Sequence, residues 1–144
     1  MQVVVDRLLT TYSRSGKGKQ VLIVPGWGDN IGNWKDFGDE LSHKFEVISL
    51  DLPGFGGTQA PHKAWGLDDY AHFVAAFIAK LKLAPYAFVG HSNGGAVVVR
   101  GLGQKVLSAE KLILLASAGI RGEYKGRNYA LRVVTKAGKA LTTP

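Results

Sequence analysis

A serine flanked by glycines is the residue best suited to chemistry in this sequence. Residues 90–94 read Gly-His-Ser-Asn-Gly, which fits the pattern G-x-S-x-G. They lie between an apolar strand-like run at 86–89 and an apolar helix-like run at 96–102. A serine on a sharp turn from strand to helix exposes its hydroxyl and has a strained backbone. We therefore predict that Ser92 is a nucleophile for acyl transfer.

Glycines on both sides of the serine fit this interpretation. The end of the strand and the first turn of the helix pass close together, so only small residues fit there. Gly90 and Gly94, together with Gly95, are expected to provide that room.

A second glycine-rich loop, at 25–33, is predicted to assist the serine. It begins Pro-Gly-Trp-Gly-Asp-Asn and follows an apolar run at 21–24. Acyl transfer needs two N–H donors aimed at the tetrahedral oxyanion, and Gly26 and Gly28 would let the backbone approach it. The backbone N–H groups of Trp27 and Asn93 are the candidate donors. The alternative interpretation of this loop is a plain tight turn.

A third loop, at 51–58, is expected to be structural and to order the wall of the site. Phe55 in this loop and His91 beside the serine are candidate pocket residues. The segment Gly54-Phe55-Gly56-Gly57 does not fit the dinucleotide pattern G-x-G-x-x-G, and no phosphate-binding loop of the P-loop type occurs.

Apolar and β-branched runs alternate with longer amphipathic segments along the chain. Strands are expected at 3–5, 8–12, 20–25, 45–50, 86–89 and 110–116, and helices at 34–44, 67–83 and 93–105. The first two strands would form a hairpin. Continuous apolar strands separated by helices predict an α/β fold, with a predominantly parallel sheet covered by helices on both faces. The three glycine-rich loops would then meet at the carboxyl ends of the strands, where such sheets bind ligands.

Size and composition set further limits. The 144 residues suit a globular domain of ordinary size, and the absence of cysteine excludes disulfides, a thiol nucleophile and cysteine-based metal sites. No metal or organic cofactor is expected, because acyl transfer through serine needs none. The apolar runs have the length of strands, so a signal peptide or membrane span is not predicted, and we expect a cytoplasmic protein.

Positive charge is concentrated after residue 120. Six lysines and arginines and one acid lie between Arg121 and Pro144, which accounts for five of the seven net positive charges. A solvated helix face is the favoured interpretation. Nucleic-acid binding is not predicted, because no aromatic residues interleave with the basic ones and no zinc finger or helix-turn-helix is present. A basic amphipathic helix can lie on an anionic membrane, but the alanine- and valine-rich apolar side lacks bulky anchors, so membrane binding ranks low.

The three loops together resemble the α/β-hydrolase superfamily, most of all its small esterases and C–C bond hydrolases. The resemblance rests on Pro-Gly-Trp-Gly-Asp-Asn followed by Trp34, on Asp-Leu-Pro-Gly-Phe-Gly from residue 51, and on Gly-His-Ser-Asn-Gly-Gly from residue 90. Pro25-Gly26 replaces the usual His-Gly of the oxyanion loop. Serine rather than aspartate at position 92 argues against the dehalogenase and epoxide-hydrolase branches. The resemblance implies a three-layer αβα fold, a carboxylesterase-like serine hydrolase and a small-molecule acyl substrate.

The partners that would activate Ser92 are not evident in the sequence. A serine hydroxyl is a weak nucleophile until a base takes its proton. In the superfamily the acid and then the histidine follow the serine along the chain. Here no histidine follows Ser92, and the acids that follow it are Glu110 and Glu123. Of the four histidines, which are His43, His62, His72 and His91, only His62 is expected near the mouth of a pocket, and His91 is expected to be buried and hydrogen-bonded.

The resemblance implies that the acid and the histidine lie beyond residue 144. On this interpretation 1–122 are the N-terminal part of the hydrolase core, 123–144 begin a helical cap, and the C-terminal strands are missing. The catalytic triad is then incomplete in this chain, and the exposed edge of the sheet would pair with the missing half or with a second chain. The competing hypothesis is a non-catalytic remnant or binding module that keeps the fold and the pocket.

Overall fold

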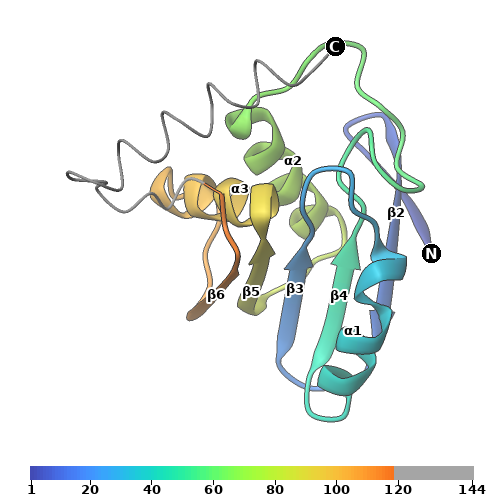
Figure 1. Cartoon of the computed structure of the whole chain (residues 1–144), viewed down its shortest axis with the longest axis vertical. Coiled ribbons are helices and arrows are strands. Elements are labelled where there is room, and N and C mark those ends of the chain that lie inside the picture. Colours follow the sequence, from blue (N-terminus) through green and yellow to red (C-terminus); the bar gives the residue numbers. More distant parts are fainter. Residues whose placement is uncertain (119–144) are drawn as a thin grey trace, which may run out of the picture.

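The computed structural model describes residues 1–118, in which strands alternate with helices (Figure 1). The elements in chain order are β1 (Gln2–Val5), β2 (Leu8–Ser15), β3 (Gln20–Val24), the 3₁₀ helix η1 (Ile31–Trp34), α1 (Lys35–Ser42), β4 (Glu46–Leu50), α2 (Leu67–Lys80), β5 (Pro85–His91), α3 (Ser92–Gly103) and β6 (Lys111–Leu115). Each strand and helix predicted within these residues is present. The expected cap segment at 123–144 and the whole basic tail from Arg121 lie outside the described residues.

The six strands form one sheet in the order β1-β2-β4-β3-β5-β6. The strands β3, β4, β5 and β6 are parallel to one another, whereas β2 is antiparallel to both β1 and β4. This confirms the predicted hairpin and the predominantly parallel sheet. Because β4 lies on one side of β3 and β5 on the other, the strand order reverses between β3 and β5. Ligands of open α/β sheets bind at such a reversal, outside the carboxyl ends of the strands.

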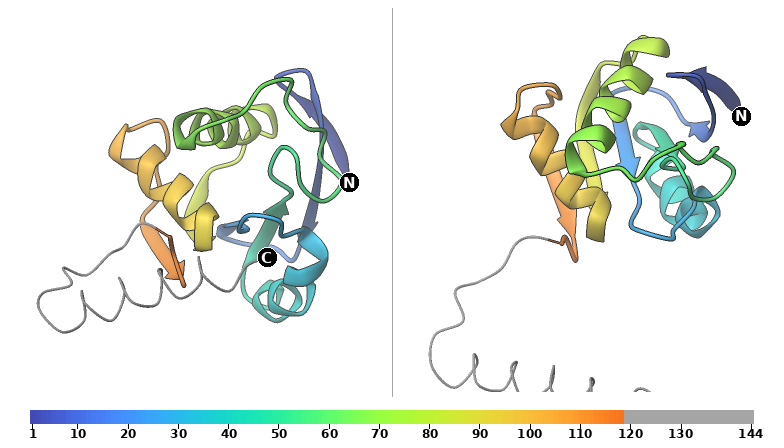
Figure 2. Two further views of the ribbon diagram at one scale, coloured as in Figure 1. Left: turned by 45° about the horizontal axis from the view of Figure 1, so that its top comes forward. Right: turned by 90° about the horizontal axis from the view of Figure 1, so that it is seen from above.

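Helices cover both faces of the sheet, as predicted (Figure 2). One face packs against α2 and α3 and forms the larger core, whose bulkiest fully buried members are Phe73, Phe77, Phe88, Leu22, Ile48 and Leu50. The other face packs against η1 and α1, where Trp34 and Leu41 contact Val21, Ile23 and Val47. Alternate residues of β3 therefore enter opposite cores, which is why this strand is apolar throughout.

Two helix boundaries differ from the predicted ones for local reasons. The helix expected at 34–44 begins earlier, as the 3₁₀ turn η1, because the Asn30 side chain accepts a hydrogen bond from Gly32 N at 2.8 Å. Helix α2 ends at Lys80 rather than at residue 83. Lys82 has a φ of +53°, and Leu83 N donates to Ile78 O at 2.9 Å, which is the hydrogen bond of a Schellman-type helix end.

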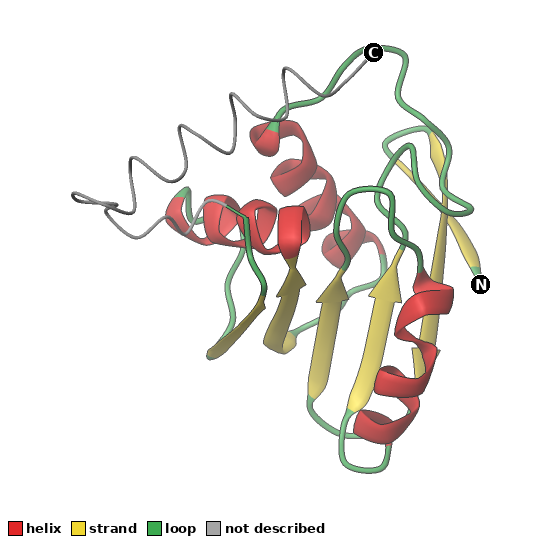
Figure 3. Ribbon diagram, viewed as in Figure 1, coloured by secondary structure: helices red, strands yellow, loops and turns green. Residues whose placement is uncertain are grey.

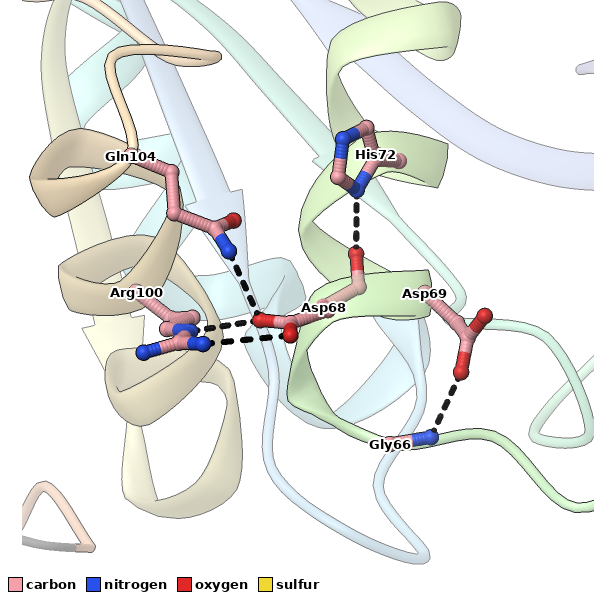
Figure 4. Close-up of polar contacts among 6 residues, drawn as sticks. All are labelled: Gly66, Asp68, Asp69, His72, Arg100 and Gln104. Carbon is pink, nitrogen blue, oxygen red and sulfur yellow. Dashed lines mark hydrogen bonds and ion pairs between the residues drawn. The ribbon is translucent and has the colours of Figure 1, made fainter.

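A polar cluster ties the start of α2 to α3 (Figure 4). The Arg100 guanidinium donates to both oxygens of Asp68, at 2.5 and 3.1 Å, and the Gln104 amide donates to the same carboxylate at 3.0 Å. Arg100 lowers the pKa of the Asp68 carboxyl. Asp69 accepts from Gly66 N at 2.9 Å. Both aspartates lie in the first turn of α2, where the helix dipole favours negative charge.

Two loops and the start of α3 meet at the carboxyl ends of the parallel strands (Figure 3). The loops follow β3 and β4, and α3 begins directly after β5. The topology therefore brings together the three glycine-rich segments that the sequence singles out. Within residues 1–118, no helix combines the length and the apolar character that a membrane span requires.

Candidate active site

Ser92 lies at the junction of β5 and α3, on a strained backbone. Strand β5 ends at His91, α3 begins at Ser92, and the φ of Ser92 is +48°. A serine rarely adopts this left-handed conformation, which costs roughly 1–2 kcal/mol. The chain reverses at this residue, as a nucleophile elbow requires.

The glycines around Ser92 are required by close backbone contacts. A Cβ atom at Gly90 would lie 2.6 Å from Gly95 Cα, and one at Gly94 would lie 2.2 Å from the carbonyl oxygens of Val24 and Pro25. Both distances are far below van der Waals contact. The end of β5, the first turn of α3 and the end of β3 are therefore packed backbone against backbone.

The loop after β6 fixes the elbow from the other side. Ala118 N donates to Ser92 O at 2.8 Å, and Ala116 has a φ of +44°. A Cβ atom at Gly95 would lie 2.4 Å from Ser117 Oγ, so this loop packs directly on the first turn of α3. The sequence pattern did not indicate this contact.

The loop after β3 passes against the nucleophile. It forms a turn in which Asp29 N donates to Gly26 O at 3.3 Å and Gly28 has a φ of +73°. A Cβ atom at Gly26 would lie 3.1 Å from Ser92 Cβ, so a larger residue would be crowded against the serine. The structure thus brings the two predicted loops together.

The two candidate oxyanion donors belong to these loops. Trp27 follows Gly26, and its backbone N–H donates to no atom of residues 1–118. Asn93 is the second residue of α3, and the first N–H groups of a helix have no carbonyl partner within the helix. Two N–H groups therefore remain for a substrate oxygen, and their role in binding an oxyanion stays a prediction.

Asp29 is a hub of hydrogen bonds that the sequence analysis missed. Its carboxylate accepts from Asn30 N at 2.9 Å, from Asn33 Nδ2 at 2.7 Å and from Trp34 Nε1 at 2.8 Å. Burial raises the pKa of this carboxyl, but the hydrogen bonds from Asn33 and Trp34 outweigh burial and leave the pKa below its ordinary value. Asp29 thereby holds the loop after β3 in shape. The run of Asp, Asn, Asn and Trp within six residues was the available signal.

The prediction for His91 requires a correction. We expected a buried, hydrogen-bonded histidine, but its side chain is 36% exposed and its buried Nδ1 atom makes no hydrogen bond among the described residues. Nδ1 lies 3.6 Å from Asp29 Oδ2, and the ring packs on Trp34 at 5.4 Å between centroids. The reason is spatial. Asp29 already accepts three hydrogen bonds from its own loop, and the His91 ring packs beside Gly26 at the start of that loop.

Asp51 gives the loop after β4 its structural role. This aspartate is 2% exposed, and its carboxylate accepts from Ile31 N at 2.7 Å and from Gly57 N at 2.8 Å. It therefore joins the loop after β4 to the start of η1. In the same loop, the Phe55 ring lies 4.8 Å from the Trp27 ring, which supports Phe55 as a pocket residue.

None of the four histidines, all of which lie within residues 1–118, is hydrogen-bonded to Ser92. His43 caps the end of α1, and His72 bonds the Asp68 carbonyl through Nδ1 at 2.7 Å. His62 lines a hollow together with Trp27. No base for the serine is therefore found among the described residues.

A hollow of about 910 Å³ lies away from these loops. It is lined by Gln20 and Pro85, which begin β3 and β5, so it lies at the amino ends of the strands. The volume of a hollow therefore does not identify the candidate site, whose loops lie at the opposite, carboxyl ends of the strands.

Comparison with known proteins decides the family. The sequence profile of the α/β-hydrolase fold matches residues 19–131, which include every loop described above.

The chain belongs to the α/β-hydrolase fold family.

Relatives within this family include several hydrolases. The chain is 33% identical over 139 residues to a dihydrolipoyllysine-residue acetyltransferase component of the acetoin cleaving system of Pseudomonas putida, covering 96% of this chain and 37% of that protein. It is 34% identical over 118 residues to a 2-hydroxy-6-oxo-6-(2'-aminophenyl)hexa-2,4-dienoic acid hydrolase of Metapseudomonas resinovorans, covering 77% of this chain and 40% of that protein.

A solved structure supports the fold. The meta-cleavage product hydrolase CumD of Pseudomonas fluorescens IP01 superposes with a TM-score of 0.78 at 24% identity, covering 85% of this chain and 47% of that chain. The chain thus spans less than half the length of these three proteins.

Proposed function

We propose that this chain carries the nucleophile and the oxyanion donors of a serine hydrolase that cleaves an ester or a C–C bond. The observation that carries the proposal is the strained Ser92 between β5 and α3, with Gly26 of the facing loop in contact with it. An α/β-hydrolase presents its nucleophile on this kind of turn.

The proposed reaction is acyl transfer in two steps. Ser92 Oγ gives its proton to a base as it attacks the carbonyl carbon of the substrate, and the N–H groups of Trp27 and Asn93 donate to the oxygen that becomes negative. Collapse of the tetrahedral intermediate releases the leaving group, which takes up that proton, and leaves an acyl group on Ser92. Water then attacks that acyl group, and the serine is regenerated. The hydrolase names of relatives such as the dienoic acid hydrolase support a small acyl substrate.

We further propose that the base and its acid lie beyond residue 144. The superfamily places them after the nucleophile along the chain, and this sequence has no histidine after Ser92. The limited share of the relatives that the chain covers supports this. The chain alone would then retain only the residual catalysis that oxyanion donors and binding provide.

The edge of the sheet is the proposed contact for the missing half or for a second chain. Strand β6 is the last strand of the sheet and pairs only with β5 among the described strands. Leu112 and Ile113 of β6 are 38% and 41% exposed. An exposed apolar edge strand is a template for pairing with a further strand.

A non-catalytic binding module is the second candidate, and one observation favours it. None of the histidines of this chain is hydrogen-bonded to Ser92. A protein that keeps the elbow but lacks a base would bind acyl compounds without turnover.

Labelling with a fluorophosphonate separates the two candidates. We expect a covalent adduct on Ser92, mapped by peptide mass spectrometry, which forms slowly in residues 1–144 and faster when imidazole is added as an external base. Ser92→Ala should give no adduct at that peptide. If Ser92 stays unlabelled with imidazole, and also in a longer protein that includes this chain, the binding module is favoured.

A further inference from the structure

An aromatic hollow opens beside the candidate oxyanion loop. Its volume is about 500 Å³, within the range of small-molecule sites. The rings of Trp27, Phe55, Trp65 and Tyr70 line it. Trp27 lies 4.8 Å from Phe55 and 6.5 Å from Tyr70, and Trp65 lies 5.3 Å from Tyr70, all between ring centroids and all edge to face.

The hollow has a rigid floor and one exposed wall. Tyr70 is buried, and its hydroxyl donates to Pro53 O at 3.2 Å. Because the hydroxyl already has a hydrogen-bond partner, Tyr70 offers a ligand only the apolar surface of its ring. Trp65 packs against buried Phe73 at 5.6 Å. Trp27, by contrast, is 66% exposed. A large aromatic face held in place yet open to solvent is typical of a surface that a ligand covers.

The position of Trp27 connects this hollow to the nucleophile. Gly26, the residue before it, is the one whose added Cβ would lie 3.1 Å from Ser92 Cβ. The residue before Trp27 therefore lies against the elbow, while Trp27 itself lines the hollow. A substrate attacked at Ser92 has this hollow as the adjacent space for its non-reacting part.

The ionisable groups that line the hollow include a lysine and no acid. His62 and Lys63 line the hollow, and no aspartate or glutamate does. Lys63 forms no ion pair within residues 1–118. A neighbouring hollow that shares Lys63 is lined by Asp6, Asp68 and Asp69; Asp68 is paired with Arg100, and Asp69 accepts from Gly66 N.

We propose that this hollow binds a planar, conjugated group that carries a carboxylate, stacked on Trp27 and with its negative charge toward Lys63. The inference rests on the proposed function in placing that group next to a carbonyl carbon attacked by Ser92. A flat π-system matches the edges and faces of four rings better than a branched alkyl group of similar size, because such ring pairs gain energy beyond the area they bury. The lysine ammonium attracts the carboxylate, and no acid lines the hollow itself.

Proton–nitrogen NMR of the three tryptophan side chains tests this directly. Trp34 serves as an internal control, because its indole N–H is bonded to Asp29 and it does not line the hollow. Titration with trans-cinnamate should shift the indole resonances of Trp27 and Trp65 together and saturably, and that of Trp34 far less. Trp27→Ala should weaken binding about tenfold. Phe55→Leu, in the same wall of the hollow, should also weaken cinnamate binding, by a smaller factor.

Two matched ligands and two further variants complete the experiment. Cinnamamide lacks the charge and 3-cyclohexylpropanoate lacks the planar system, and both should bind more weakly than cinnamate. Lys63→Met should weaken cinnamate binding and leave cinnamamide binding unchanged. Absence of saturable shifts, equal shifts at Trp34, or equal affinity for cinnamate and cyclohexylpropanoate would overturn the proposal. Asp36→Asn, at an exposed position outside the hollow, should bind cinnamate normally. Saturable cinnamate binding by a protein whose Ser92 is not labelled would overturn the proposed hydrolase and leave this site standing.

Discussion

The Oδ2 atom of Asp29 and the Nδ1 atom of His91 lie 3.6 Å apart, so the loop after β3 meets the strand end that precedes Ser92. The same carboxylate holds the side chains of Asn33 and Trp34. One half-buried carboxylate therefore orders the loop that carries Trp27, beside the end of the strand that precedes Ser92.

Asp29→Asn should destabilise the fold in a pH-dependent way. Loss of the carboxylate leaves an N–H donor of Asn33 or Trp34 without a proper acceptor, at a cost of about 1–3 kcal/mol at pH 7. The pKa of Asp29 is lowered from 3.8, so the unfolded chain binds its proton first as pH falls. The stability difference between wild type and variant, measured by urea unfolding, should be constant down to about pH 5 and narrow below it. A difference that widens in acid would contradict this role.

Ser92→Gly should be more stable than Ser92→Ala by about 1 kcal/mol, because glycine adopts the φ of +48° without strain. Both variants lack the hydroxyl, so the comparison isolates the backbone. Thermal unfolding of the two proteins measures the difference. Equal stability would show that the elbow stores no strain.

Gly94→Ala should cost about 1–3 kcal/mol, because its Cβ would collide with two backbone carbonyls that cannot move independently. Gly103→Ala is the matched control, since it lies in the same helix and has open space around it. That substitution should be neutral or should stabilise by about 0.5–1 kcal/mol. The pair is compared by urea unfolding, and similar losses in both would contradict the packing described at Ser92.

Asp51→Asn should cost about 1–3 kcal/mol, because a buried carboxylate that accepts from Ile31 N and Gly57 N is replaced by a weaker acceptor. Asp36→Asn, at an exposed position, is the control. Hydrogen exchange of the Ile31 and Gly57 amides should also accelerate in Asp51→Asn. Unchanged exchange at both amides would show that Asp51 does not hold the loops together.

The sequence predicts the framework of this site better than its internal contacts. Continuous apolar runs indicate the parallel strands, and the rule that ligands bind at their carboxyl ends brings the loops of Gly26 and Ser92 together. The roles of Asp29 and Asp51 could not be predicted, because each depends on which N–H groups a folded loop turns inward. The environment of His91 was mispredicted for the same reason. Its nearest acceptor belongs to a residue 62 positions earlier, which no local pattern indicates.

The central claim is that Ser92 is a nucleophile facing two amide hydrogens, and a crystal structure of the fluorophosphonate adduct tests it most directly. We predict a phosphorus bonded to Ser92 Oγ, with the phosphonyl oxygen within about 3.1 Å of both Trp27 N and Asn93 N. An adduct on another residue, or a phosphonyl oxygen on Ser92 directed to solvent and out of reach of both N–H groups, would contradict the account.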